Sequence, residues 1–136
     1  MTEATDANNY KTQYEYDEVG RIKRVIDAMN GTTEYDYDAA GRILSVKDVM
    51  GYKTVFTYNN LGLVETVRDP KGAVTKYEYD SNGNLTKLID AEDNVTKWQY
   101  DRNGNIKKII DSLGNATTYT YDRINQVKSI TNAKGD

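Results

Sequence analysis

The stretch TKYEYDSNGNLTKLIDAEDNV, residues 75–95, contains an alternating aromatic run, a turn signal, an apolar pair and a second turn signal. The same 21-residue pattern occurs six times without insertion or deletion. One tyrosine marks it in every unit: Tyr16, Tyr37, Tyr58, Tyr79, Tyr100 and Tyr121. Such a period is typical of a repeat array, in which each unit buries its apolar side chains only against its neighbours. The pattern therefore favours a structural scaffold over a catalyst.

The first part of each unit has the period of a β-strand. Thr75, Tyr77 and Tyr79 alternate with polar residues, and the Thr position is Thr in all six units. The position two residues before the central tyrosine is always aromatic: Tyr14, Tyr35, Phe56, Tyr77, Trp98 and Tyr119. Alternation of this kind, with Thr and aromatic residues, predicts a strand with one buried face. We expect the Thr column and the two aromatic columns to form the packed face of a sheet.

A turn signal, Asp-x-x-Gly, follows the aromatic strand. A type I turn favours Asp at its first position and Gly at its fourth, because the carboxylate caps the turn and Gly accepts a positive φ. The clearest examples are Asp17 with Gly20, Asp38 with Gly41, Asp80 with Gly83, and Asp101 with Gly104. A second turn signal ends each unit, and there Asn30 and Asp93 replace Gly. Both residue types tolerate the left-handed conformation, so we expect them to adopt it.

The apolar pair between the two turns has an unusual spacing. In the unit quoted above it consists of Leu85 and Leu88, three residues apart. Residues three apart point to opposite faces of a flat strand, and six residues between turns are too few for a stable helix. A β-bulge would re-aim one of the two side chains. The spacing therefore predicts a strand that contains a bulge or a strong twist.

Turns at intervals of 10 or 11 residues predict an all-β antiparallel meander of β-hairpins, with about twelve strands and two per unit. Open twisted sheets of more than about 10 strands curl or split, so we expect a curved or spiralling strip. The leucine-rich pattern is absent, and three four-stranded blades would be too few for a propeller. We assign residues 10–136 to the six-repeat array. Residues 1–9 are expected to be a disordered lead-in or an artificial boundary.

Composition excludes several kinds of protein. The 136 residues include 12 Tyr but no Cys and no His, and the net charge is −3. Without Cys there is no disulfide or thiolate metal site, and without His the commonest general base is missing. Interspersed charges do not form the basic patch of a nucleic-acid-binding protein, and no apolar run is long enough to span a membrane. We expect no enzyme activity, no catalytic residues and no cofactor.

The Asp columns admit a calcium-binding interpretation. Residues 80–84, Asp-Ser-Asn-Gly-Asn, loosely resemble a calcium loop, but the Gly and the later Glu of an EF-hand are out of register. Capping of the turns explains the same Asp residues. We therefore assign no metal site.

Two features point to possible interaction surfaces. Tyr10 and Tyr52 lie outside the aromatic columns, and exposed aromatics of this kind would suit a ligand surface, with carbohydrate as the favoured class. The array also has two edge strands, expected near Lys11–Tyr16 and Gln126–Thr131. Exposed edges pair with other chains, and a one-layer sheet leaves its aromatic face in need of cover. Edge-to-edge or face-to-face homo-oligomers are therefore expected.

The sequence Tyr-Asp-x-x-Gly-x-apolar, repeated over residues 11–136, resembles the YD repeat of the Rhs family. That family includes bacterial polymorphic toxins, shell-forming subunits of insecticidal toxin complexes, wall-associated bacterial proteins and teneurins. The resemblance implies a spiralling strip of β-hairpins that forms a hollow shell, which in the toxins encloses a C-terminal toxic domain. It also implies a secreted or cell-surface parent protein, whereas we expect the fragment itself to be soluble. Unlike many relatives, the chain has only six units and no recognisable self-cleavage region. An extracellular module that binds carbohydrate or a cell-surface partner is the alternative.

Overall fold

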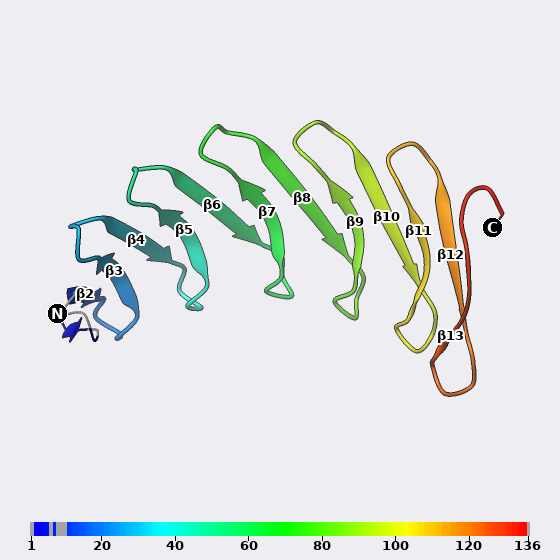
Figure 1. Cartoon of the computed structure of the whole chain (residues 1–136), viewed down its shortest axis with the longest axis horizontal. Helices are drawn as coiled ribbons and strands as arrows, with labels where there is room; N and C mark the ends of the chain where they lie inside the picture. The colour runs from blue at the N-terminus through cyan, green and yellow to red at the C-terminus, as the bar shows by residue number, and fades with distance from the viewer. Residues whose placement is uncertain (1, 6, 8–10, 136) are drawn as a thin grey trace. The chain divides into compact units, whose positions relative to one another are not determined.

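The computed structural model describes residues 2–5, 7 and 11–135. Thirteen antiparallel strands form one open sheet in which each strand pairs with the next in sequence, as Figure 1 illustrates for the labelled strands. The strands are β1 (Thr2–Thr5), β2 (Lys11–Tyr16), β3 (Ile22–Ile26), β4 (Thr32–Tyr37), β5 (Ile43–Lys47), β6 (Lys53–Tyr58), β7 (Val64–Arg68), β8 (Val74–Tyr79), β9 (Leu85–Ile89), β10 (Val95–Tyr100), β11 (Ile106–Ile110), β12 (Ala116–Tyr121) and β13 (Val127–Thr131). The prediction of an all-β hairpin meander is confirmed.

The chain divides into two compact units. The first comprises residues 1–57 and 67–73, and the second comprises residues 58–66 and 74–136. The first unit therefore contains β1 to β5 and most of β6, and the second contains β8 to β13. Each unit repeats the same hairpin geometry. The curvature expected for the strip stays a prediction.

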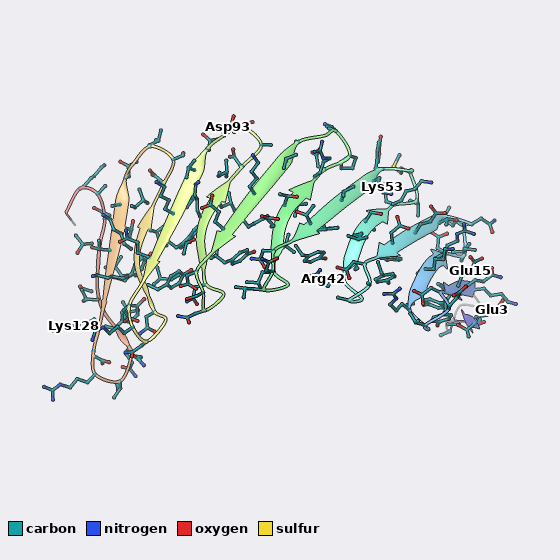
Figure 2. The ribbon with its side chains drawn as sticks, turned by 180° about the vertical axis from the view of Figure 1, so that it is seen from behind. Glu3, Glu15, Arg42, Lys53, Asp93 and Lys128 are labelled. Carbon is teal, nitrogen blue, oxygen red and sulfur yellow. The ribbon has the colours of Figure 1, made fainter. Side chains whose placement is uncertain are left out.

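The turns share one pattern of hydrogen bonds. In the turn after β8 the Gly83 amide donates to the Asp80 carbonyl at 3.1 Å, and the Asp80 amide donates to the Asn84 carbonyl at 2.9 Å. Gly83 has a φ of +86°, which L-residues with a Cβ rarely adopt. Asn30 and Asp93, each at φ 63°, take the same conformation where Gly is missing, as predicted. Asp93 lies at the turn between β9 and β10 (Figure 2).

Each repeat consists of an aromatic strand followed by a strand with the apolar pair. In every repeat whose strand register is described, this second strand contains a bulge. Between β8 and β9, Tyr77 pairs with Leu88 and Tyr79 with Leu85, so the ladder skips Thr86. Residues directly opposite one another in an antiparallel pair lie on the same face. The bulge therefore brings Leu85 and Leu88 onto the aromatic face despite their three-residue spacing, and the predicted bulge is confirmed. The residues skipped at the equivalent point are Lys23, Leu44, Lys107 and Lys128.

The sheet is a single layer with little full burial. Among the described residues Ser45 alone is buried, at 4% exposed, and no hydrophobic side chain is. The aromatic and apolar columns are mostly half-buried, each side chain covered by those on neighbouring strands. This is the nearest-neighbour packing that a repeat array requires.

Strand β1 was not predicted. Thr2–Thr5 pair with β2, where Ala4 lies opposite Thr12 in the place that Val25 takes opposite Thr33 one unit later. Our expectation that Lys11–Tyr16 is an edge strand is wrong, because β1 and β3 flank it on both sides. Ala4 is too small to give the apolar signal that marks the other strands. The assignment of residues 1–9 as a lead-in stays an untested boundary, although β1 lies within it.

Candidate functional site

The central tyrosine joins one repeat to the next through its hydroxyl. The Tyr79 hydroxyl donates to the Val64 carbonyl at 2.9 Å, and the Tyr100 hydroxyl donates to the Leu85 carbonyl at 2.7 Å. Tyr37 and Tyr121 donate in the same way to the residue fifteen positions earlier. The acceptor Leu85 stands at the bulge described above, where the ladder is interrupted. The tyrosine hydroxyl therefore supplies a hydrogen bond to a backbone carbonyl at the point where the regular β-ladder is interrupted.

This use of the hydroxyl distinguishes the two aromatic columns. The column of Tyr79 is Tyr in every unit, whereas the neighbouring column admits Phe56 and Trp98. Burial raises the pKa of the Tyr79 and Tyr100 hydroxyls, so both remain protonated donors at neutral pH. The first column needs a hydroxyl, and the second needs only an aromatic ring.

The turn carboxylates are occupied by hydrogen bonds within their own turns. Asp80 Oδ1 accepts from the Asn82 and Asn84 amides, each at 2.9 Å, and Oδ2 accepts from Asn84 Nδ2 at 2.9 Å. These bonds, the side-chain bond from Asn84 first, hold the pKa of Asp80 below its ordinary value. The pKa values of five further turn residues are lowered as well: Asp17, Asp38, Asp90, Asp101 and Asp111.

No group of three or more potential metal-binding side chains occurs among residues 2–5, 7 and 11–135. In the turn of residues 80–84, which we compared with a calcium loop, both carboxylate oxygens of Asp80 serve the turn.

Arg21 connects the equivalent turns of two successive repeats in the first unit. Its Nε lies 2.6 Å from Asp17 Oδ2, and Nη1 donates to the Asp38 carbonyl at 3.1 Å. The guanidinium also lies over the Tyr37 ring, 4.6 Å from the centroid. Arg21 thus combines an ion pair within its own repeat with a hydrogen bond and a cation–π contact to the next repeat. The contact was not predicted from the sequence, although Arg21 and Arg42 occupy the same repeat position.

A hollow of about 490 Å³ lies beside Arg21, lined by Tyr16, Tyr35 and Tyr37 together with Asp17 and Lys23. Three aromatic rings and charges of both signs would suit a polar ligand with an apolar face. The hollow belongs entirely to the first unit. Its described lining does not include Tyr52, which the sequence suggested as a ligand residue.

The opposite face of the first unit carries a ladder of charges. The Arg24 guanidinium forms ion pairs with the carboxylates of Glu15, at 3.3 Å, and Glu34, at 3.1 Å. The Glu34 carboxylate also lies 3.4 Å from Lys47 Nζ. Figure 2 shows Glu15 on this part of the chain. These exposed pairs contribute little stability each. They make this face polar, in contrast to the aromatic face.

The suggested ligand residues are placed only in part. Tyr10 lies outside the described residues. Tyr52 is 56% exposed and follows the turn that carries Met50, itself 74% exposed. The equivalent turn of the preceding repeat exposes Met29, at 89%. Val49 lies close to that turn, since a side chain at Gly31 would meet Val49 Cγ1 at 3.0 Å. Tyr52 thus follows a turn that exposes two apolar side chains, Val49 and Met50.

The described residues contain no helix long and apolar enough to cross a membrane.

Solved structures of similar fold are parts of toxin complexes. The chain aligns with the crystal structure of TcdB2-TccC3-Cdc42 at a TM-score of 0.75 and 20% identity, over 90% of this chain and 7% of that one. TcdB2-TccC3 gives a TM-score of 0.74 at 22% identity, again over 90% and 7%. A Tc holotoxin pore from Photorhabdus luminescens with a TccC3 mutation gives 0.60 at 19% identity, over 90% and 9%. At these identities the likeness is one of fold, and the chain spans less than a tenth of each neighbour.

Comparison with curated proteins gave no match. The family model for the RHS repeat matches residues 16–49, 37–74, 58–95 and 100–136, which together cover most of the sequence. The matched segments follow the hairpin period seen in the structure. The chain is a structural repeat module and belongs to the RHS repeat family.

Proposed function

We propose that this chain builds part of the wall of a shell that encloses a passenger domain, and that it self-associates when isolated. The observation that carries this proposal is the aromatic face, whose side chains are covered only by their neighbours in the same layer. A sheet face of this composition gains stability when a second surface covers it. In a longer protein the cover would be a passenger, and in the isolated chain it would be a second copy.

The comparisons support the passenger part of the proposal. RHS repeats match along the chain, and the structural neighbours are toxin complexes. By analogy with its family, the passenger would be a toxin domain and the parent protein would be secreted or displayed at the cell surface. The wall itself needs no catalytic group, in agreement with the absence of His from the sequence.

Trp98 offers a direct test of whether the aromatic face is covered. It is the only tryptophan, it is half-buried, and it lies on the aromatic face opposite Ile109. Cover by a second copy removes water from the indole, so its emission should shift to the blue and acrylamide quenching should fall as protein concentration rises. The matched control is Phe56→Trp in a Trp98→Phe background, which places the probe at the same position two repeats earlier. Emission that is independent of concentration at both positions would argue against cover of this face.

The second candidate function is a carbohydrate- or cell-surface-binding module. It is favoured by the exposed ring of Tyr52, which follows a turn that exposes Val49 and Met50. Exposed aromatic side chains in an apolar cluster often mark binding surfaces. Binding on a glycan array that is lost in Tyr52→Ala and kept in Tyr119→Phe would favour this function, and an array without signal would oppose it.

A further inference from the structure

The two edge strands of the described sheet differ in polarity. At the N-terminal end β1 is a short strand, Thr-Glu-Ala-Thr, whose Glu3 forms a 2.8 Å ion pair with Lys11 on β2. At the C-terminal end β13 is exposed along its whole length, and Val127 and Ile130 are 54% and 57% exposed. In the described sheet β13 pairs with β12 alone. A polar edge resists pairing with another chain, whereas an apolar one invites it.

We propose that the free edge of β13 binds strand β2 of a second copy, in the register that joins successive repeats, and that β1 competes with it for β2. This inference rests on the self-association in the proposed function and adds an edge-to-edge contact to the cover of the aromatic face. The interface between two copies would have the same strand pairing as the interface between successive repeats within one chain.

The repeat interface sets the register. Where one repeat meets the next, an apolar residue lies opposite the Thr of the following strand: Val25 opposite Thr33, Val46 opposite Thr54, Leu88 opposite Thr96, and Ile109 opposite Thr117. On β13 the residue in this column is Ile130, which pairs with Tyr119 on its other side. The strand that fits beside it must therefore present Thr opposite Ile130.

Strand β2 meets this requirement. It contains Thr12, Tyr14 and Tyr16 at the spacing of the Thr-x-aromatic-x-Tyr strands. With Thr12 opposite Ile130, Gln13 falls opposite Ser129, so no like charges meet. The same register takes the Tyr16 hydroxyl to the Val127 carbonyl, as Tyr121 reaches Ile106 at 2.7 Å within the chain.

Strand β1 holds the position that β13 would take. Ala4 lies opposite Thr12, where the other repeats place Val, Leu or Ile. Exchange of β1 for a partner's β13 replaces Ala4 by Ile130 and buries more apolar surface, which favours association. Against this, β1 is tethered to β2 at a high effective concentration and keeps the Glu3–Lys11 pair. Association is therefore expected at high protein concentration and is limited by release of β1.

The geometry of the exchange leads to open assemblies. The β13 edge of one copy takes the β2 edge of the next, so the contact is head-to-tail and leaves both outer edges free. A heterologous contact of this kind gives chains of copies unless the ring closes.

Cysteine cross-linking tests the register directly, because the protein has no cysteine of its own. Mixed Thr12→Cys and Ile130→Cys proteins should form an intermolecular disulfide between these two positions, identified by mass spectrometry of the linked peptides. Residues directly opposite in an antiparallel pair are within disulfide reach. The matched control is Gln13→Cys with Ile130→Cys, in which the two thiols point to opposite faces and should remain unlinked.

Two variants of β1 test the competition. Ala4→Cys with Thr12→Cys in one chain locks β1 onto β2 when oxidised, and it should abolish association until the disulfide is reduced. Glu3→Lys places two cations together and should lower the concentration at which copies associate. The exchange Glu3→Lys with Lys11→Glu restores the opposite charges and should restore the original concentration.

The outcomes separate this inference from the proposal on which it rests. Association that persists in the oxidised lock, or equal linking of the control pair, would overturn the β2–β13 register and leave self-association standing through another surface. Protein that stays monomeric at every concentration, with Glu3→Lys included, would overturn both. Linking confined to the Thr12 and Ile130 positions, together with loss of association in the lock, would establish the interface.

Discussion

At the scale of single residues, the tyrosine hydroxyl is the clearest link between sequence and structure. The Tyr79 hydroxyl reaches the Val64 carbonyl of the preceding repeat at 2.9 Å. Tyr79→Phe removes that donor and leaves the carbonyl without it, so unfolding should become easier by about 0.5–1.5 kcal/mol. Chemical denaturation followed by circular dichroism measures the change. Tyr77→Phe on the same strand is the control, since its column already contains Phe56. Equal losses in the two variants would contradict a specific role for the Tyr79 hydroxyl.

The turn aspartates give the protein an acid-sensitive contribution to stability. Hydrogen bonds, above all from the Asn84 side chain, hold the pKa of Asp80 below its ordinary value. Because the pKa is lower in the folded chain than in the unfolded chain, this contribution is complete above the unfolded value. It is lost as the pH falls through the folded value.

Asn84→Ala tests this assignment. It removes the Nδ2 donor, so the pKa of Asp80 should rise toward its ordinary value in an NMR titration of the carboxyl group. Asp101, whose carboxylate is bonded by Asn105 in the next repeat, is the internal control and should keep its lowered pKa. A shift of both carboxyl groups, or of neither, would contradict a local origin.

At the scale of the strand, the bulge explains why the apolar residues of each repeat are three positions apart and still lie on one face. Lys107 is the residue skipped between β10 and β11, where Trp98 pairs with Ile109 and Tyr100 with Ile106. Deletion of Lys107 alone would keep Ile106 on the aromatic face, two positions from Ile109. Deletion of both Lys107 and Lys108 should make Ile106 and Ile109 adjacent and turn Ile106 away from that face. The loss of apolar contact should cost about 1–3 kcal/mol.

Thermal and chemical denaturation check this prediction. The control is Lys107→Thr, which should be close to neutral because Thr86 is the skipped residue two strands earlier. A double-deletion variant as stable as the parent chain would mean that the strand tolerates Ile106 on either face.

Local signals explain which elements could be predicted. Strands and turns followed from alternation, from Asp and Gly at fixed positions, and from the tolerance of Asn30 and Asp93 for positive φ. The bulge followed from the three-residue spacing of pairs such as Leu85 and Leu88. Each of these features is decided within a few residues of sequence.

Contacts between repeats were harder to predict. Arg21 meets the Asp38 carbonyl seventeen residues away, and Tyr79 meets Val64 fifteen residues away. Their partners are backbone carbonyls, which carry no residue-type signal. Strand β1 was not predicted because Ala4 takes the place of the larger Val, Leu or Ile found at this position in the other repeats.

At the scale of the whole molecule, the protein is an array of hairpins with one aromatic face, and the two edge strands of its described sheet differ in polarity. The aromatic face would be stabilised by a second surface that covers it, and the edge of β13 would be stabilised by a partner strand. Both features fit the wall element proposed above.

The most direct test of this account is the absolute mass in solution, measured by light scattering on a sizing column over a concentration series. A single chain has a mass of 15.4 kDa. The account predicts a mass that exceeds this value and rises with concentration, since the uncovered face and the free edge both gain from a second copy. A constant 15.4 kDa at every concentration, with slowly exchanging amides on the free side of β13, would contradict it.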